Sequence, residues 1–268
     1  MDKVTVNTHG MEFGYELISA VPFAYWLHEN DMLEKTISTE DSKCLYYFSP
    51  DHEESVPKRH NNNHAKVMRD GIIPNVNIHK ADLNWSRWCP PPYKEHYAND
   101  EFDFDVVVCN KFNVEWKRPP VNYYSTDALF EIFDSLWDYK VLYNHMTSDM
   151  GRDDTVPSLD LNEWPVVDVF RNVTTIQSLI DKAVYSYNEL QMRIYANAKL
   201  FVTVQGGSVI FTSYFGGKNV VFAKEGKELD RGSYDGWFKK LGGADIVHYN
   251  NYDDILKEIE LWKRSMTL

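Results

Sequence analysis

Cysteines are few in this sequence and are not spaced as metal ligands. The 268 residues include three, Cys44, Cys89 and Cys109, and no two of them form a CxxC pair. Because the number is odd and the spacing irregular, neither a disulfide framework nor a structural zinc site is expected. A reducing compartment is the default environment for such a chain.

Long hydrophobic runs are also lacking. No apolar segment approaches the roughly 20 residues that a helix needs to cross a bilayer. The opening residues, MDKVTVNTHG, have the pattern of a strand rather than that of a signal peptide. We therefore expect no transmembrane segment and a cytoplasmic protein, in which the sequons at Asn84 and Asn172 are not glycosylated.

Basic residues are the scarcer charged class. Lys and Arg number 28 against 40 Asp and Glu, which gives a formal net charge of −12. This balance argues against a nucleic-acid partner, whose phosphate backbone requires a basic face. It leaves a nucleotide ligand open, because one diphosphate needs only a few local donors. The aromatic fraction is high, at 15%, which suits stacking on sugar or base rings and equally suits ordinary core packing.

The usual patterns of a metal site are absent or misplaced. His60 and His64 are separated by three asparagines, and no HExxH glutamate accompanies them. Asp103 and Asp105 form a DxD pattern, which in metal-dependent glycosyltransferases lies in the loop after a strand. Here the pair precedes the apolar run Val106–Cys109. We interpret it as solvation of a strand edge and predict no metal site and no cofactor.

The clearest local pattern lies in the stretch 200–225, LFVTVQGGSVIFTSYFGGKNVVFAKE. Leu200–Val204 is rich in β-branched and aromatic residues, as in a buried strand. Gly206 and Gly207 allow a tight turn and close approach of a ligand to the backbone, and Ser208 follows where an N-cap belongs. This order predicts a strand, a turn and a helix N-terminus suited to a phosphate, although a tight turn without a ligand has the same signature.

Several other elements have equally local signals. Gly216–Gly217 is predicted to stop the helix that Ser208 opens, and Asn219–Ala223 has the composition of a second strand. Ser125 is placed to cap a helix. A capping box at Ser186–Glu189 starts another. From residue 252 onward the chain is an amphipathic helix.

The N-terminus repeats the order of strand, glycine loop and helix. Val4–Val6 predicts a short strand, Gly10 lies in the loop, and an apolar helix follows to about residue 30. Polar groups at the carboxyl end of a strand in an open α/β sheet are where ligands bind. His9, Glu12 and Glu16 are therefore site candidates, although both glutamates also favour a helix N-terminus electrostatically.

Two further loops contain candidate ligand-binding side chains. The segment Trp85–Tyr97 carries three consecutive prolines, and its Trp85 and Trp88 suit a platform for a sugar face or a clamp onto the core. Arg152 lies in a polar loop after the predicted strand Lys140–Tyr143. An arginine there can reach a phosphate bidentately or remain solvated.

Strands and helices alternate in each half of the chain. Cys44–Phe48 and Val76–His79 are predicted as further strands, and Lys117–Pro120 as a linker. The alternation predicts an α/β protein with mainly parallel sheets. We expect two domains, 1–120 on the acceptor side and 121–268 on the nucleotide side, with the last helix a candidate for packing back on the first domain.

Two segments resemble a glycosyltransferase family of the two-domain GT-B type, which includes enzymes encoded by large DNA viruses of algae. They are EFGYELISAVPFAYWLHEN at 12–30 and SYNELQMRIYANAKLFVTVQGGSVIFTSYFGG at 186–217, followed by NVVFAKEGKEL. The resemblance implies two Rossmann-like domains that face a cleft, with a nucleotide diphosphate sugar held mainly by the second domain. It also implies a role in viral glycan synthesis.

The resemblance also implies roles for individual residues. The donor-binding set is Gln205, Gly206, Gly207 and Ser208 at the diphosphate, with Lys224 or Glu225 near the nucleoside or donor sugar. The N-terminal loop from Gly10 to Glu16 would face the acceptor and the reaction centre. The sequence lacks the EX7E pair of some retaining families, which leaves retention or inversion of the anomeric centre open.

The hypothesis from sequence is transfer of a sugar from a nucleotide diphosphate sugar, with a UDP-sugar favoured, to a glycan or glycoprotein acceptor. Glu12 is the first candidate for the base that deprotonates the acceptor hydroxyl and His9 the second. The turn amides, helped by Arg152 or Lys224, would stabilise the leaving diphosphate without a metal.

Two other classes remain possible from sequence. A carbohydrate- or nucleotide-binding module without catalysis would use the aromatic-rich proline loop. A methyltransferase also places its cofactor on a glycine-rich turn, but normally after the first strand, and here QGGS lies late in the chain.

Overall fold

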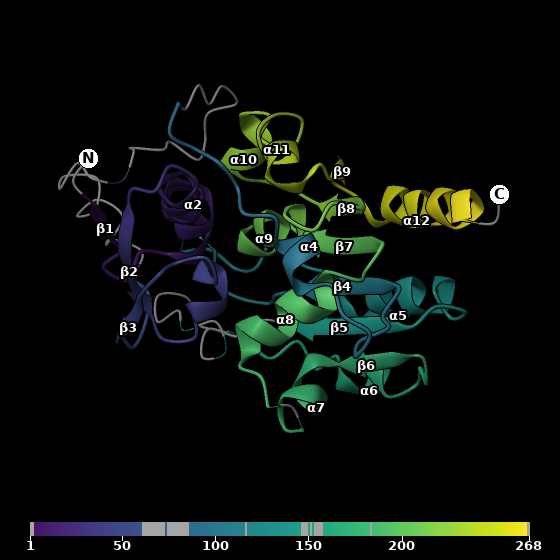
Figure 1. Cartoon of the computed structure of the whole chain (residues 1–268). Helices are drawn as coiled ribbons and strands as arrows, with labels where there is room; N and C mark the ends of the chain where they lie inside the picture. The colour runs from purple at the N-terminus through teal and green to yellow at the C-terminus, as the bar shows by residue number, and fades with distance from the viewer. Residues whose placement is uncertain are drawn as a thin grey trace.

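The chain forms an α/β structure with two parallel sheets (Figure 1). The computed structural model describes residues 3–60, 73, 86–115, 117–145, 150, 152, 158–182 and 184–266. In this part of the chain one sheet has the strand order β1-β2-β3 and the other β6-β5-β4-β7-β8-β9. The predicted α/β class with parallel strands is confirmed.

The strands are β1 (Val4–Asn7), β2 (Leu33–Thr39), β3 (His52–Val56), β4 (Val106–Asn110), β5 (Val141–His145), β6 (Val173–Thr175), β7 (Leu200–Val204), β8 (Lys218–Phe222) and β9 (Asp245–Tyr249). The α-helices are α1 (Phe13–Tyr15), α2 (Val21–Glu29), α4 (Tyr93–Tyr97), α5 (Thr126–Ser135), α6 (Trp164–Val167), α7 (Ile176–Ile180), α8 (Tyr187–Tyr195), α9 (Gly207–Ser213), α10 (Lys227–Asp230), α11 (Lys239–Gly242) and α12 (Tyr252–Met266). A π-helix, η1 (Glu16–Ala20), joins α1 to α2, and a 3-10 helix, η2 (Lys43–Tyr46), follows β2.

The larger sheet is doubly wound. From β4 the chain adds β5 and β6 on one side, then returns to add β7, β8 and β9 on the other. The direction of strand addition therefore reverses between β4 and β7. Strands β4, β5 and β7 are buried along their whole length, as expected for apolar strands covered on both faces.

Each face of the larger sheet has its own core. On one face the apolar residues of α5 and α12 pack against alternate strand residues such as Val108 and Val202. On the other face, Val107 and Phe201 pack with α8 and α9. The last helix therefore packs on the larger sheet and not on residues 3–60, which contain the smaller sheet and its helices and are called the N-terminal unit below. Its apolar stripe, including Ile259, completes the first of these cores.

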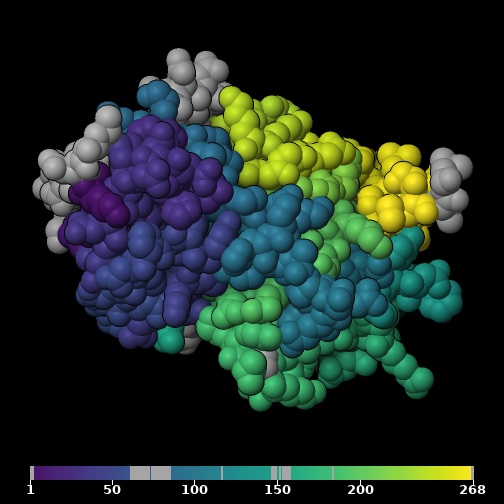
Figure 2. Space-filling model, viewed as in Figure 1, coloured from purple at the N-terminus to yellow at the C-terminus, as the bar shows by residue number. Residues whose placement is uncertain are grey.

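The smaller sheet is joined to the larger one by a continuous hydrophobic core. Val6 and Leu17 from the N-terminal unit belong to the same buried cluster as Phe211 and Tyr214, which lie in and directly after α9 on the larger sheet. The Tyr214 hydroxyl donates to the carbonyl of Leu17. Figure 2 shows the purple and blue surface of the N-terminal residues in direct contact with the teal and green surface. The expected cleft between two domains stays a prediction.

Two details of the expected fold differ in the structure. Cys44–Phe48 is not a strand, because its first three residues belong to the 3-10 helix η2. The third strand is instead His52–Val56, which is polar and mostly exposed. A run of consecutive apolar residues predicts a buried strand, but a buried helical turn has the same pattern. The boundary at residue 120 divides the larger sheet, because β4 precedes it. The predicted strand Val76–His79 lies outside the described residues.

The DxD pair lies at the amino end of β4, as expected. Asp103 forms an ion pair with Lys140, and the carboxylate of Asp105 lies 3.3 Å from the Lys199 ammonium. These contacts confirm that the two aspartates solvate and pair at a strand edge.

Candidate functional site

The segments that follow β1 and β7 meet at the junction of the two sheets. The ring of Phe13 in α1 lies 5.5 Å from that of Phe211 in α9, with an edge-to-face geometry. A Cβ added at Gly207 would lie 3.5 Å from Phe13 Cδ1. The two glycine loops that the sequence singles out, one in each half, are thus brought side by side.

The turn after β7 depends on its first glycine. Gly206 is the N-cap of α9 and has a φ of 131°. Residues other than glycine rarely adopt that backbone conformation. Ser208 is not the N-cap. It lies inside the first turn of the helix, and its hydroxyl donates to the Val204 carbonyl at 3.1 Å. The helix begins earlier than expected because Gly206 supplies the turn by itself.

Lys111 is a site residue that the sequence reasoning missed. It directly follows β4, and its ammonium lies 3.2 Å from the position of a Cβ added at Gly206. The strand order reverses between β4 and β7, and in doubly wound sheets ligands bind outside the carboxyl ends of the strands at such a point. The signal that identifies Lys111 is therefore topological, because it requires knowing that β4 and β7 are neighbours.

Gln205 is buried and faces the segment after β8. Its side-chain amide donates to Glu228 at 3.1 Å, and 2% of the residue is exposed. Gly226 makes room for it, because a Cβ there would lie 1.4 Å from the Gln205 amide nitrogen. Burial raises the pKa of Glu228, which the nearby Lys111 ammonium lowers in part. Glu228 is a second residue that sequence reasoning missed.

Lys224 and Glu225 follow β8 and are held from the other side by Asn122. The Asn122 side-chain oxygen accepts from the Lys224 amide at 2.8 Å and from the Glu225 amide at 3.3 Å. The carboxylate of Glu225 pairs with Arg118 at 2.8 Å and is 48% exposed. These contacts place both residues at the carboxyl edge of the larger sheet, near the end of β7.

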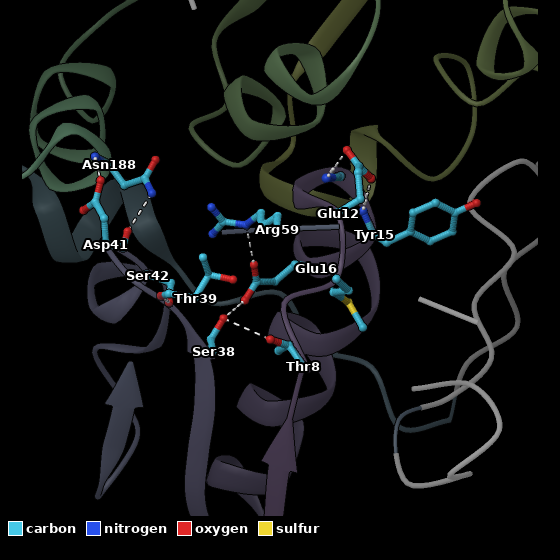
Figure 3. Close-up of polar contacts among 12 residues, drawn as sticks. Thr8, Glu12, Tyr15, Glu16, Ser38, Thr39, Asp41, Ser42, Arg59 and Asn188 are labelled. Atoms are coloured by element: carbon cyan, nitrogen blue, oxygen red, sulfur yellow. Dashed lines mark hydrogen bonds and ion pairs between the residues drawn. The ribbon is translucent and has the colours of Figure 1, made fainter. Parts of the chain in front are cut away.

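Glu12 caps the short helix that follows β1. Its two carboxylate oxygens accept from the amides of Gly14 at 2.9 Å and Tyr15 at 3.1 Å (Figure 3). Glu12 therefore acts at the N-terminus of a helix, which is one of the two roles that the sequence left open. His9 has a positive φ of 50°, and its amide donates to the Asn7 side chain at 2.8 Å.

Glu16 is buried and belongs to an ion pair. No part of it is exposed; its carboxylate accepts from Arg59 at 3.1 Å, from the Tyr46 hydroxyl at 3.0 Å and from the Ser38 hydroxyl. In Figure 3 this cluster lies at the carboxyl ends of β1 and β2. Such enclosure argues against direct contact between Glu16 and an acceptor.

Arg59 connects this buried pair to the junction. Its guanidinium carbon lies 4.9 Å from the centre of the Phe13 ring, and Phe13 in turn packs against α9. Its amide donates to the Arg152 carbonyl at 2.6 Å. The Arg152 side chain, 43% exposed, lies 3.7 Å from Glu40. The structure thus places Arg152 beside the N-terminal unit.

Trp88 fastens the proline loop to the N-terminal unit. Its indole N–H donates to the Ile18 carbonyl at 2.8 Å, and its ring packs against the buried cluster. Tyr93 in the same segment is fully buried and donates to the Leu45 carbonyl at 2.7 Å. These contacts fit the clamp interpretation of the loop. Trp85 lies outside the described residues.

The described residues show neither a metal-binding cluster nor a membrane-spanning helix. They contain no group of three or more His, Cys, Asp or Glu side chains placed to hold a metal ion. None of the helices formed by these residues has the length and apolar character needed to span a membrane.

Comparisons with known proteins identify a slight structural likeness. No family model matches the chain, and no curated protein matches it. Among solved structures, the wall teichoic acid polymerase TagF aligns with a TM-score of 0.36 and 12% sequence identity, over 88% of this chain and 51% of that one. The chain thus spans about half the length of that polymerase structure. A likeness of this degree assigns neither a family nor an activity, and the glycosyltransferase resemblance of the sequence remains a prediction.

Proposed function

We propose that this protein is a glycosyltransferase that moves a sugar from a nucleotide diphosphate sugar to a hydroxyl of a glycan or glycoprotein. The observation that carries the proposal is the position of Lys111 beside Gly206, at the point where the strand order of the larger sheet reverses. Bare glycine backbone next to an ammonium group suits a diphosphate, because the ligand can approach closely and meet a positive charge.

In this proposal the larger sheet holds the donor. Lys111 and the backbone at Gly206–Gly207 bind the diphosphate and stabilise it as it leaves. Lys224 and Glu225, at the adjacent strand end, lie toward the nucleoside or the donor sugar. Arg152 lies beside the N-terminal unit, so we assign it at most a supporting role in binding the diphosphate.

The acceptor lies toward the segment after β1. Glu12 and His9 are the proposed bases for the acceptor hydroxyl, because both lie in the loop that leads into α1, the helix that contacts α9. A base works best when its lone pairs are available, and both oxygens of Glu12 accept backbone hydrogen bonds. Each oxygen keeps a second acceptor site, so Glu12 can accept a proton in place, and it does so more readily when the cap of α1 loosens.

Both oxygens of Glu12 accept backbone hydrogen bonds. This observation favours one alternative function, a nucleotide- or carbohydrate-binding protein without catalysis. Hydrolysis of a nucleotide sugar by the purified protein separates the two. Release of the nucleotide diphosphate supports the enzyme. Binding without any release supports the alternative.

Donor binding is tested by a thermal-shift screen against UDP-, GDP- and dTDP-sugars, followed by calorimetry on the best ligand. Lys111→Met should weaken binding by about 100-fold, because a charged hydrogen bond to phosphate is lost. Lys199→Met is the matched control, since Lys199 pairs with Asp105 at the amino edge of the same sheet. Unchanged affinity in Lys111→Met, with both variants folded, contradicts the proposed site.

A further inference from the structure

The ammonium of Lys111 is already occupied by a carboxylate. Lys111 forms an ion pair with Glu115, in which the two side chains are 19% and 7% exposed. The second carboxylate oxygen of Glu115 accepts from the Asn122 side chain at 2.9 Å. Glu115 is thus held at both oxygens, next to the ammonium that lies beside Gly206.

A second acid lies close to the same ammonium. The charges of Lys111 and Glu115 act in opposite directions on the pKa of Glu228. Glu228 is fixed by its bond from Gln205. Glu228 thus adds a second acidic group within electrostatic range of Lys111, and when ionised it repels an incoming anion as Glu115 does.

We infer that Glu115 stands where a phosphate of the ligand binds and acts as a built-in competitor that admits only ligands with a diphosphate. The inference rests on the proposed function, because it concerns the same site. A carboxylate and a phosphate both offer anionic oxygens to an ammonium, so one can replace the other.

Displacement of Glu115 explains how the site selects its ligand. In this inference a ligand oxygen takes the place of Glu115 at the Lys111 ammonium, and Glu115 moves toward water while Asn122 can still donate to it. A diphosphate compensates with several charged contacts to Lys111 and the turn. A nucleoside or a neutral sugar offers none, and a monophosphate offers fewer.

The experiment measures binding of uridine, UMP and UDP, and of the guanosine series, to the full chain by calorimetry. Glu115→Gln keeps the acceptor for Asn122 and removes the charge. We expect it to bind the diphosphate about 10-fold more tightly, because the competing charge is gone. It should also discriminate less between diphosphate and monophosphate. Glu258→Gln is the control, since Glu258 forms a comparably buried ion pair with Lys218 at the amino end of β8, and we expect its affinities to match the wild type.

The outcomes separate this inference from the proposed function. Equal or weaker diphosphate binding in Glu115→Gln overturns the inference, while binding by the wild type leaves the donor site standing. Binding only after the Glu115→Gln change supports the inference. If neither protein binds any of the diphosphates, the proposed function fails and the role of Glu115 with it. Glu115→Asp, whose shorter side chain reaches Lys111 less well, gives the same test if the glutamine variant does not fold.

Discussion

The buried pair of Glu16 and Arg59 shows how strongly one residue can be tied to the rest of this molecule. Neither side chain is exposed, and three groups donate to the Glu16 carboxylate. Sequence position suggested a ligand contact at the end of a strand. The structure instead assigns Glu16 to holding Arg59, and through Arg59 to supporting Phe13 at the junction.

Removal of the cation from this pair should be costly. We expect Arg59→Met to lower the free energy of unfolding by about 3–5 kcal/mol, because it leaves a buried carboxylate without its partner. Urea denaturation followed by circular dichroism measures this change.

A surface pair provides the comparison. Arg193→Met removes a partner of Glu189 one helical turn away, where the side chains are 28% and 33% exposed, and should cost at most about 1 kcal/mol. Equal losses in the two variants would show that the Glu16–Arg59 pair is not buried as the structure has it.

The elements of the fold are largely decided by local signals. Ser125 caps α5 by accepting from the Ala128 amide at 3.2 Å, and Ser186 caps α8, both as predicted. The helix α9 ends at Ser213, before the predicted stop at Gly216–Gly217; Gly217, with a φ of 67°, turns the chain into β8, and a Cβ there would lie 2.7 Å from a backbone oxygen. Ser208 is the exception, because the glycine before it already turns the chain.

Ser125 caps a helix and Ser208 does not, and this difference should appear in the stability of alanine variants. Ser125→Ala should destabilise the protein by about 1 kcal/mol, because a cap is lost. Ser208→Ala should change stability by less than about 0.5 kcal/mol, since alanine favours the helix interior and the lost bond is a back-bond to a carbonyl. Thermal and urea unfolding of the two variants compare them directly; a larger loss in Ser208→Ala would restore Ser208 as a cap.

At the scale of the whole molecule, one hydrophobic cluster extends across both sheets. It includes residues from β1, η1, α8, α9 and α11. The two termini lie at opposite ends of the molecule in Figure 1, and α12 extends away from the N-terminal unit. A core shared in this way couples the two sheets energetically, because either one alone would expose the apolar surface it buries in the other.

This shared core predicts a single unfolding transition. Calorimetry should show one peak whose calorimetric and van't Hoff enthalpies agree, because the sheets cannot unfold independently. Two separate peaks, or a calorimetric enthalpy well above the van't Hoff value, would indicate two domains that fold on their own. Addition of the best nucleotide sugar should shift the whole transition rather than one part of it.

The sequence by itself determined most of the elements and the class of the fold. Apolar runs, glycines and capping serines act within a few residues, so β7, the turn at Gly206–Gly207 and the ends of α5 and α8 follow from local chemistry. It also marked the two loops that meet at the junction, since both follow strands and contain glycine.

Only the tertiary structure decided which of the candidate polar side chains lie at the junction, where they can contact a ligand, and which are buried. The order of strands brings Lys111 to Gly206 and buries Glu16, and the side to which α12 packs depends on which apolar face is left uncovered. These outcomes arise from contacts between residues far apart in the chain, and a periodic pattern contains no information about its partner. The stretch around Gly206 was therefore recognisable from its own residues, whereas the ammonium beside it was not.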